Sequence, residues 1–223
     1  MKKRNDFDAI ASFYDALAGI IFGASIKKAQ LHFIPSIPEN SKILFIGGGT
    51  GWLLPTILKI PGVSITYVDL SVNMIKQARK KILPEQEKSV KFIQKDIYQF
   101  LNGKKETVNE EFNVIITNFF LDVFNKENLV KIMILIDRVL QINGLWICTD
   151  FQKQPGRSLW YSWQNFLIYL MYKFFKMISN IEGKRILDFD AHFASLKFIP
   201  VHEVYFFHTM IKTSLFKKSE CFK

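Results

Sequence analysis

Between residues 41 and 150, short apolar runs alternate with stretches whose apolar positions recur at helical spacing. The apolar runs are rich in β-branched residues and predict strands at 42–46, 64–68, 90–93, 113–117 and 145–149. The stretches between them predict helices over 51–59, 71–83 and 126–140. Strands that are apolar along their whole length and alternate with helices form parallel sheets with both faces covered. We therefore predict an α/β fold.

The two ends of the chain and one internal segment lie outside this alternation. Residues 6–34 and 158–179 carry apolar side chains at helical spacing, whereas 201–207 and 210–216 predict two antiparallel strands at the sheet edge. Segment 158–179 lacks the charge-free apolar run that a bilayer span needs, so no transmembrane helix is predicted. We interpret the chain as one domain over 1–223, with N-terminal cap helices (1–40), the alternating core (41–150), an inserted amphipathic helical region (151–196) and a terminal strand pair (197–223).

Composition adds few constraints. Hydrophobic residues make up 49% of the 223 residues and charged residues 22%, which is typical of a globular protein. Cys148 and Cys221 show no metal-type spacing, so we expect neither a metal site nor a disulfide framework. Asp6 and Asp8 interrupt any apolar run near the N-terminus, which argues against a targeting segment and for a cytoplasmic protein. The net charge of +10 comes from scattered lysines, so charge alone indicates no partner.

The strongest chemical signal is the run Gly47-Gly48-Gly49-Thr50-Gly51 after the first predicted strand. Glycines let the backbone approach a ligand closely, and the amides at a helix N-terminus favour an anionic group. Asp69 follows at the end of the second strand, where an acid can accept hydrogen bonds from both hydroxyls of a ribose. Together these features predict an adenosine-binding site at the carboxyl edge of the sheet.

The spacing of the glycines discriminates between adenosine cofactors. A dinucleotide site has the pattern G-x-G-x-x-G, but Trp52 occupies the position of its third glycine. The pattern G-x-G-x-G is complete at Gly47, Gly49 and Gly51. This favours S-adenosylmethionine and makes an NAD-dependent oxidoreductase the weaker alternative.

On these residues the sequence resembles the class I S-adenosylmethionine-dependent methyltransferases, and is most similar to their ubiquinone/menaquinone C-methyltransferase-type group. The segment Phe7-Asp8-Ala9-Ile10-Ala11-Ser12-Phe13-Tyr14-Asp15 is similar to that group's opening helix. The resemblance implies a Rossmann-like, seven-stranded, mostly parallel sheet with its last strand antiparallel. It also implies that the methionine moiety, ribose and adenine of the cofactor are held by Tyr14, Gly47, Gly48, Gly49, Gly51, Asp69, Leu70, Met74, Asp96, Ile97 and Asn118.

Two positions depart from the family pattern. The family usually has an acid two residues before the first glycine, where this chain has Phe45, so cofactor affinity is either lowered or supported from elsewhere. This change is also the only support for a nonenzymatic S-adenosylmethionine-binding or scaffold protein. Asn118 resembles the start of the Asn-Pro-Pro-aromatic signature of amino-group DNA methyltransferases, but both prolines are absent. A nucleic-acid substrate is therefore not expected.

Methyl transfer from a sulfonium needs donor and acceptor held in line, and needs a base only if the acceptor loses a proton as it attacks. The candidate bases are Tyr14, Asp122, His192 and His202, and each has an alternative structural role in a cap, a helix surface or a strand edge. The apolar side chains of 158–179 pack on the core, line an acceptor pocket or lie on a membrane surface. A small lipophilic or aromatic acceptor is the substrate class that we expect.

Overall fold

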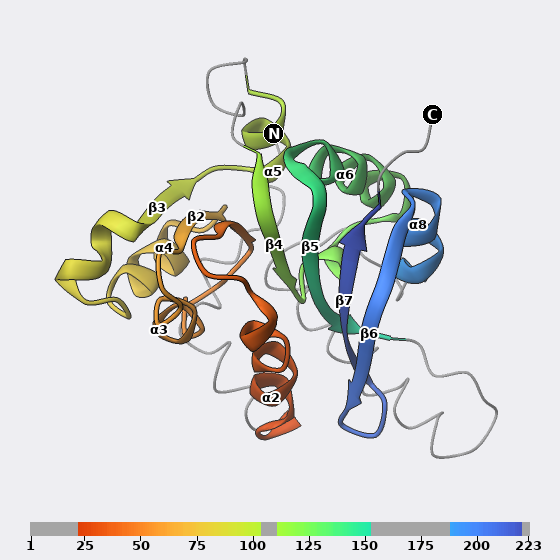
Figure 1. Cartoon of the computed structure of the whole chain (residues 1–223), viewed down its shortest axis with the longest axis horizontal. Helices are drawn as coiled ribbons and strands as arrows, with labels where there is room; N and C mark the ends of the chain where they lie inside the picture. The colour runs from red at the N-terminus through yellow and green to blue at the C-terminus, as the bar shows by residue number, and fades with distance from the viewer. Residues whose placement is uncertain (1–21, 104–110, 153–187, 220–223) are drawn as a thin grey trace.

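The computed structural model describes residues 22–103, 111–152 and 188–219. Its seven strands form one sheet in the order β3-β2-β1-β4-β5-β7-β6 (Figure 1). Neighbours from β3 to β5 are parallel, whereas β7 is antiparallel to both β5 and β6. The strands are β1 (Lys42–Ile46), β2 (Ser64–Asp69), β3 (Val90–Gln94), β4 (Phe112–Asn118), β5 (Leu140–Phe151), β6 (Phe198–Phe206) and β7 (Ile211–Lys218). The predicted mostly parallel sheet with an antiparallel last strand is confirmed.

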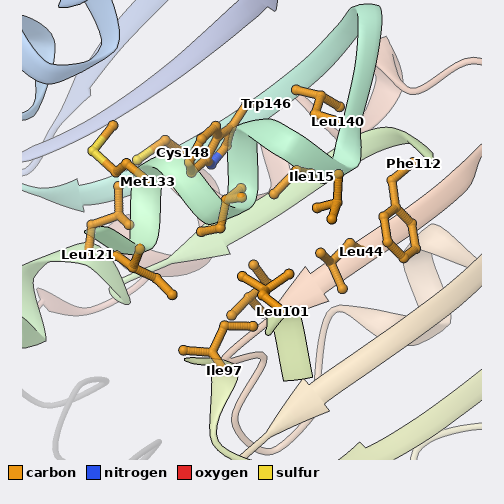
Figure 2. Close-up of a cluster of buried hydrophobic side chains, with 14 of the residues drawn as sticks. Leu44, Ile97, Leu101, Phe112, Ile115, Leu121, Met133, Leu140, Trp146 and Cys148 are labelled. Carbon is orange, nitrogen blue, oxygen red and sulfur yellow. The ribbon is translucent and has the colours of Figure 1, made fainter. Parts of the chain in front are cut away.

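Helices cover both faces of this sheet. The described helices are α2 (Ser25–Leu31), α3 (Leu54–Ile57), α4 (Val72–Arg79), α5 (Ile97–Leu101), α6 (Lys126–Val139) and α8 (Phe189–Ser195), with short turns η1 (Ile34–Ser36), η2 (Pro84–Ser89) and η3 (Leu121–Val123). One core lies between the sheet and α5, α6 and α8, and Figure 2 shows part of it. A second core lies under η1, α3 and α4. Strand β1 serves both, because alternate residues of a strand point to opposite faces.

Two helices are shorter than the sequence predicts. The predicted helix over 51–59 begins only at Leu54, since Gly51 has φ +73°, outside the helical region, and forms a turn. Ser71 caps α4 as predicted and accepts a hydrogen bond from Met74 N at 3.1 Å. However, α4 ends at Arg79, and Leu83 adopts the extended backbone that a following proline favours. Among the described residues, no helix is long and apolar enough to cross a bilayer.

Candidate functional site

A cavity opens at the carboxyl edge of the parallel strands. Going along this edge in the order β3, β2, β1, β4, its lining passes from Asp96 to Asp69, then to Gly47 and Asn118. Ligands of open α/β sheets bind at this edge. The predicted cofactor residues that line the cavity are Gly47, Gly48, Gly49, Asp69, Leu70, Met74, Asp96, Ile97 and Asn118. Tyr14 and segment 158–179 lie outside the described residues.

Two glycines of the loop have different roles. Gly49 has φ +62°, and a Cβ built on it would meet no atom within 4 Å, so its backbone faces open space in the cavity. Gly51 has φ +73°, but a Cβ there would lie 2.5 Å from Ala78 Cβ and 2.7 Å from Ala78 Cα. Gly51 does not line the cavity. The absence of a side chain at Gly51 lets the loop pack against α4, so Gly51 fixes the position of the loop without contacting a ligand in the cavity.

Asp69 connects the loop with the end of β2. Its Oδ2 accepts a hydrogen bond from Gly49 N at 3.2 Å, and its Oδ1 accepts one from Ser71 N at 2.9 Å. The residue is 9% exposed, and that part faces the cavity. Each oxygen of a carboxylate can accept more than one hydrogen bond, so a carboxylate in this place is chemically suited to a ligand that carries hydroxyl groups.

Asp96 performs a second function besides lining the cavity. Its Oδ1 accepts hydrogen bonds from Tyr98 N at 2.9 Å and from Gln99 N at 3.3 Å, which makes it the N-cap of α5. The cap fixes the start of the helix and so places Ile97, which is buried, in the cavity wall.

At the end of β4, the side chain of Asn118 brings a buried oxygen to the cavity. Asn118 Oδ1 is buried and has no hydrogen-bond partner among the described residues. Phe119 follows with φ +51°, a strained conformation for a non-glycine residue, while its N donates to Thr149 O at 2.7 Å. A buried acceptor beside a cavity fits a ligand that carries a donor. The open backbone at Gly49 and this oxygen therefore fit a bound S-adenosylmethionine.

Comparisons with known proteins agree with this geometry. A family model described as a methyltransferase domain matches residues 43–144. A demethylmenaquinone methyltransferase from Chlorobaculum tepidum is 30% identical over 233 residues, which covers 98% of this chain and 86% of that protein. The chain belongs to the class I S-adenosylmethionine-dependent methyltransferases.

Solved structures share the fold of this methyltransferase at low sequence identity. A chain of the complex between the Trm112 methyltransferase activator and a putative methyltransferase from Haloferax volcanii superposes with a TM-score of 0.71 at 11% identity, covering 98% of this chain and all of that one. The N-methyltransferase NodS from Bradyrhizobium japonicum, in complex with S-adenosyl-L-homocysteine, has a TM-score of 0.59 at 13% identity, over 87% and 84% of the two chains. The methyltransferase uses S-adenosylmethionine as its cofactor.

The candidate base Asp122 is buried in η3 of the methyltransferase, next to a second acid, Asp150 at the end of β5. Asp150 accepts hydrogen bonds from Leu121 N at 3.1 Å and from Phe151 N at 3.0 Å. Burial raises the pKa of Asp150 well above its ordinary value, and the charge of Asp122 raises it further, against the lowering effect of these N–H donors. Asp122 does not line the cavity. Through Leu121 N, Asp150 contacts the edge of the hydrophobic core in which the Leu121 side chain lies (Figure 2).

The two histidine candidates of the methyltransferase also lie away from the cavity. His192 is half-buried on α8, and its carbonyl accepts a hydrogen bond from Ser195 Oγ at 2.7 Å. His202 is exposed on β6, with its ring 5.8 Å from that of Phe33. Neither is among the residues that line the cavity.

Several lining residues of the methyltransferase were not predicted as site residues. Helix α2 contributes Lys27 and Gln30 to the lining. Trp52, which also lines the cavity, donates from its Nε1 to Gln30 Oε1 at 2.9 Å. On the β4 side, the lining continues after Asn118 with Phe119, Phe120, Val123 and Phe124. The position of Phe119 and Phe120 directly after a strand end was a signal that could have found them. No local pattern indicates that α2 reaches this edge.

Proposed function

We propose that this methyltransferase transfers a methyl group to a small lipophilic or aromatic acceptor. The observation that carries the proposal is the apolar wall after β4, where Phe119, Phe120 and Phe124 line the cavity beside Asn118. The rings of Phe120 and Phe124 pack edge to face, with centroids 5.1 Å apart, and Phe119 packs on Phe151 at 4.7 Å. Such a wall binds an aromatic ring by burial and edge contacts and offers a charged acceptor little.

The relatives support this acceptor class. Two Chlorobaculum proteins that match 98% of this chain are demethylmenaquinone methyltransferases by name, and demethylmenaquinone is a lipophilic molecule with an aromatic ring system. We extend that acceptor class to this chain, because the wall after β4 has the chemistry to receive a ring of this kind.

We also propose how the described residues hold the cofactor. Asp69 accepts hydrogen bonds from the ribose, Asp96 and Ile97 lie at the adenine, and the open backbone of Gly49 lies beside the methionine moiety. S-adenosylmethionine supplies a methyl group activated by its positively charged sulfur. The protein holds acceptor and donor in line and excludes water, and Asn118 Oδ1 orients a donor group of either molecule.

The test uses the purified full chain with S-adenosylmethionine. We expect methyl transfer to demethylmenaquinone, offered in its quinone and quinol forms, and none to a malonyl thioester. Phe119→Ala is expected to reduce this transfer by roughly tenfold, since it removes a whole ring from the wall, with little change in S-adenosylhomocysteine affinity. The control is Val130→Ala, on the exposed face of α6. Methylation of the malonyl thioester alone would contradict the proposal.

A further inference from the structure

Position 45 lies next to a tyrosine on the neighbouring strand. Phe45 replaces the acid that the family usually has there, and its ring packs edge-on against Tyr67, its register partner on β2, with centroids 5.2 Å apart. Tyr67 also contacts Phe92, its register partner on β3, at 5.4 Å. Three aromatic side chains thus form a ladder across β1, β2 and β3, and cross-strand contacts of this kind restrain each ring. Tyr67 occupies the middle of the ladder.

The ladder aims the hydroxyl of Tyr67 at the glycine loop. This hydroxyl donates to the carbonyl oxygen of Gly49 at 2.8 Å, and the ring lies so close to Gly48 that a Cβ there would overlap it. On the same face of β2, Asp69 Oδ2 accepts from Gly49 N at 3.2 Å. Both polar backbone groups of Gly49 are therefore held from β2, by side chains two residues apart.

We propose that Tyr67 is the positioning residue of the glycine loop, in the place of the family's acid at position 45. Tyr67 is fully buried and does not line the cavity, so it acts on the cofactor only through the loop. A glycine at φ +62° has many other conformations available in a free loop. The hydrogen bond from Tyr67 selects one of them before the cofactor binds, which lowers the entropy lost on binding. The inference rests on the proposed cofactor placement and on no particular acceptor.

Tyr67→Phe is the direct test, because it keeps the ring of the ladder and removes only the hydroxyl. The matched control is Tyr98→Phe, which removes a phenol that donates to a backbone carbonyl, Asn128 O, at 2.7 Å, between α5 and α6 and away from the loop. We expect calorimetric titration of the full chain to show S-adenosylhomocysteine affinity reduced about fivefold in Tyr67→Phe and unchanged in Tyr98→Phe. Equal affinities in the two variants would overturn the proposal.

Amide hydrogen exchange gives a second readout that needs no ligand. In Tyr67→Phe, peptides that contain Gly47 to Gly51 should exchange several times faster than in the wild type, whereas Tyr98→Phe should leave them unchanged. Unchanged exchange of the loop in Tyr67→Phe would also overturn the proposal. Neither measurement includes an acceptor, so an incorrect acceptor class would leave both results as they stand.

Discussion

The two halves of the carboxyl edge are built in different ways. In the half formed by β1, β2 and β3, backbone turns and short polar side chains make the site, and Asp69 and Asp96 both accept backbone N–H groups. In the half formed by β4 and β5, aromatic rings line the cavity, and a buried pair of acids lies near them without lining it. The β1–β3 half holds most of the groups that we propose for the cofactor. The β4–β5 half holds the wall that we propose for the acceptor, and it carries fewer recognisable motifs.

The difference between the halves predicts different responses to substitution. Changes in the β1–β3 half should act on backbone conformation and cofactor affinity. Adding one methyl group or removing one polar group there should already have a large effect. Changes in the β4–β5 half, those at Asn118 excepted, should act on packing, charge and acceptor turnover, with cofactor affinity retained.

The largest expected effect comes from Gly51→Ala. The alanine would have to keep the left-handed backbone of Gly51, which a Cβ disfavours, and its Cβ would meet Ala78 Cα at 2.7 Å. The variant should therefore lose about 3 kcal/mol of unfolding free energy. Gly49→Ala should lose only about 1–2 kcal/mol, because its Cβ meets no atom. Its larger loss should be in S-adenosylhomocysteine affinity, since the methyl group enters the cavity. Chemical denaturation and calorimetry on both variants measure the two effects.

Equal unfolding free energies for Gly51→Ala and Gly49→Ala would contradict the separate roles of the two glycines. If Gly51→Ala lost stability but kept its S-adenosylhomocysteine affinity at low temperature, the two roles would be separated further. Gly51 would then act only in the packing of the loop against α4.

Asp69→Ala should have the next largest effect, a loss of S-adenosylhomocysteine affinity of roughly 100-fold, or about 2.7 kcal/mol. The carboxylate is expected to bind the ribose, and it also holds Gly49 N and Ser71 N. Asp69→Asn is the control, since it keeps one acceptor oxygen and should lose less affinity. Titration calorimetry on the three proteins measures the ranking, and unchanged affinity in Asp69→Ala would remove the placement of the ribose.

The sequence predicted the β1–β3 half of the edge better than the β4–β5 half. The glycine run, Asp69 and the cap at Ser71 are local patterns, so the strands, the cofactor and the edge of the sheet were predicted correctly. The length of α3 was wrong because a left-handed residue at Gly51 has no apolar signature. The contacts between Tyr67 and Gly49 join residues 18 positions apart, and those between Leu121 and Asp150 join residues 29 apart. Such contacts depend on strand order, which no single segment encodes.

The smallest expected effect tests the buried acids of the β4–β5 half. The raised pKa of Asp150 means that the folded protein binds a proton more tightly than the unfolded chain, so stability falls as the pH rises from the ordinary value near 4 through the folded pKa. Asp122→Asn removes the like charge and so lowers that pKa. The variant should therefore be about 1 kcal/mol more stable than the wild type near pH 8 and little different near pH 4. Asp137→Asn is the control, because Asp137 faces Lys218 Nζ at 3.0 Å and its loss should bring no gain at alkaline pH. Denaturant unfolding across the pH range measures both, and a wild-type pH dependence retained in Asp122→Asn would show that the two carboxyl groups titrate independently.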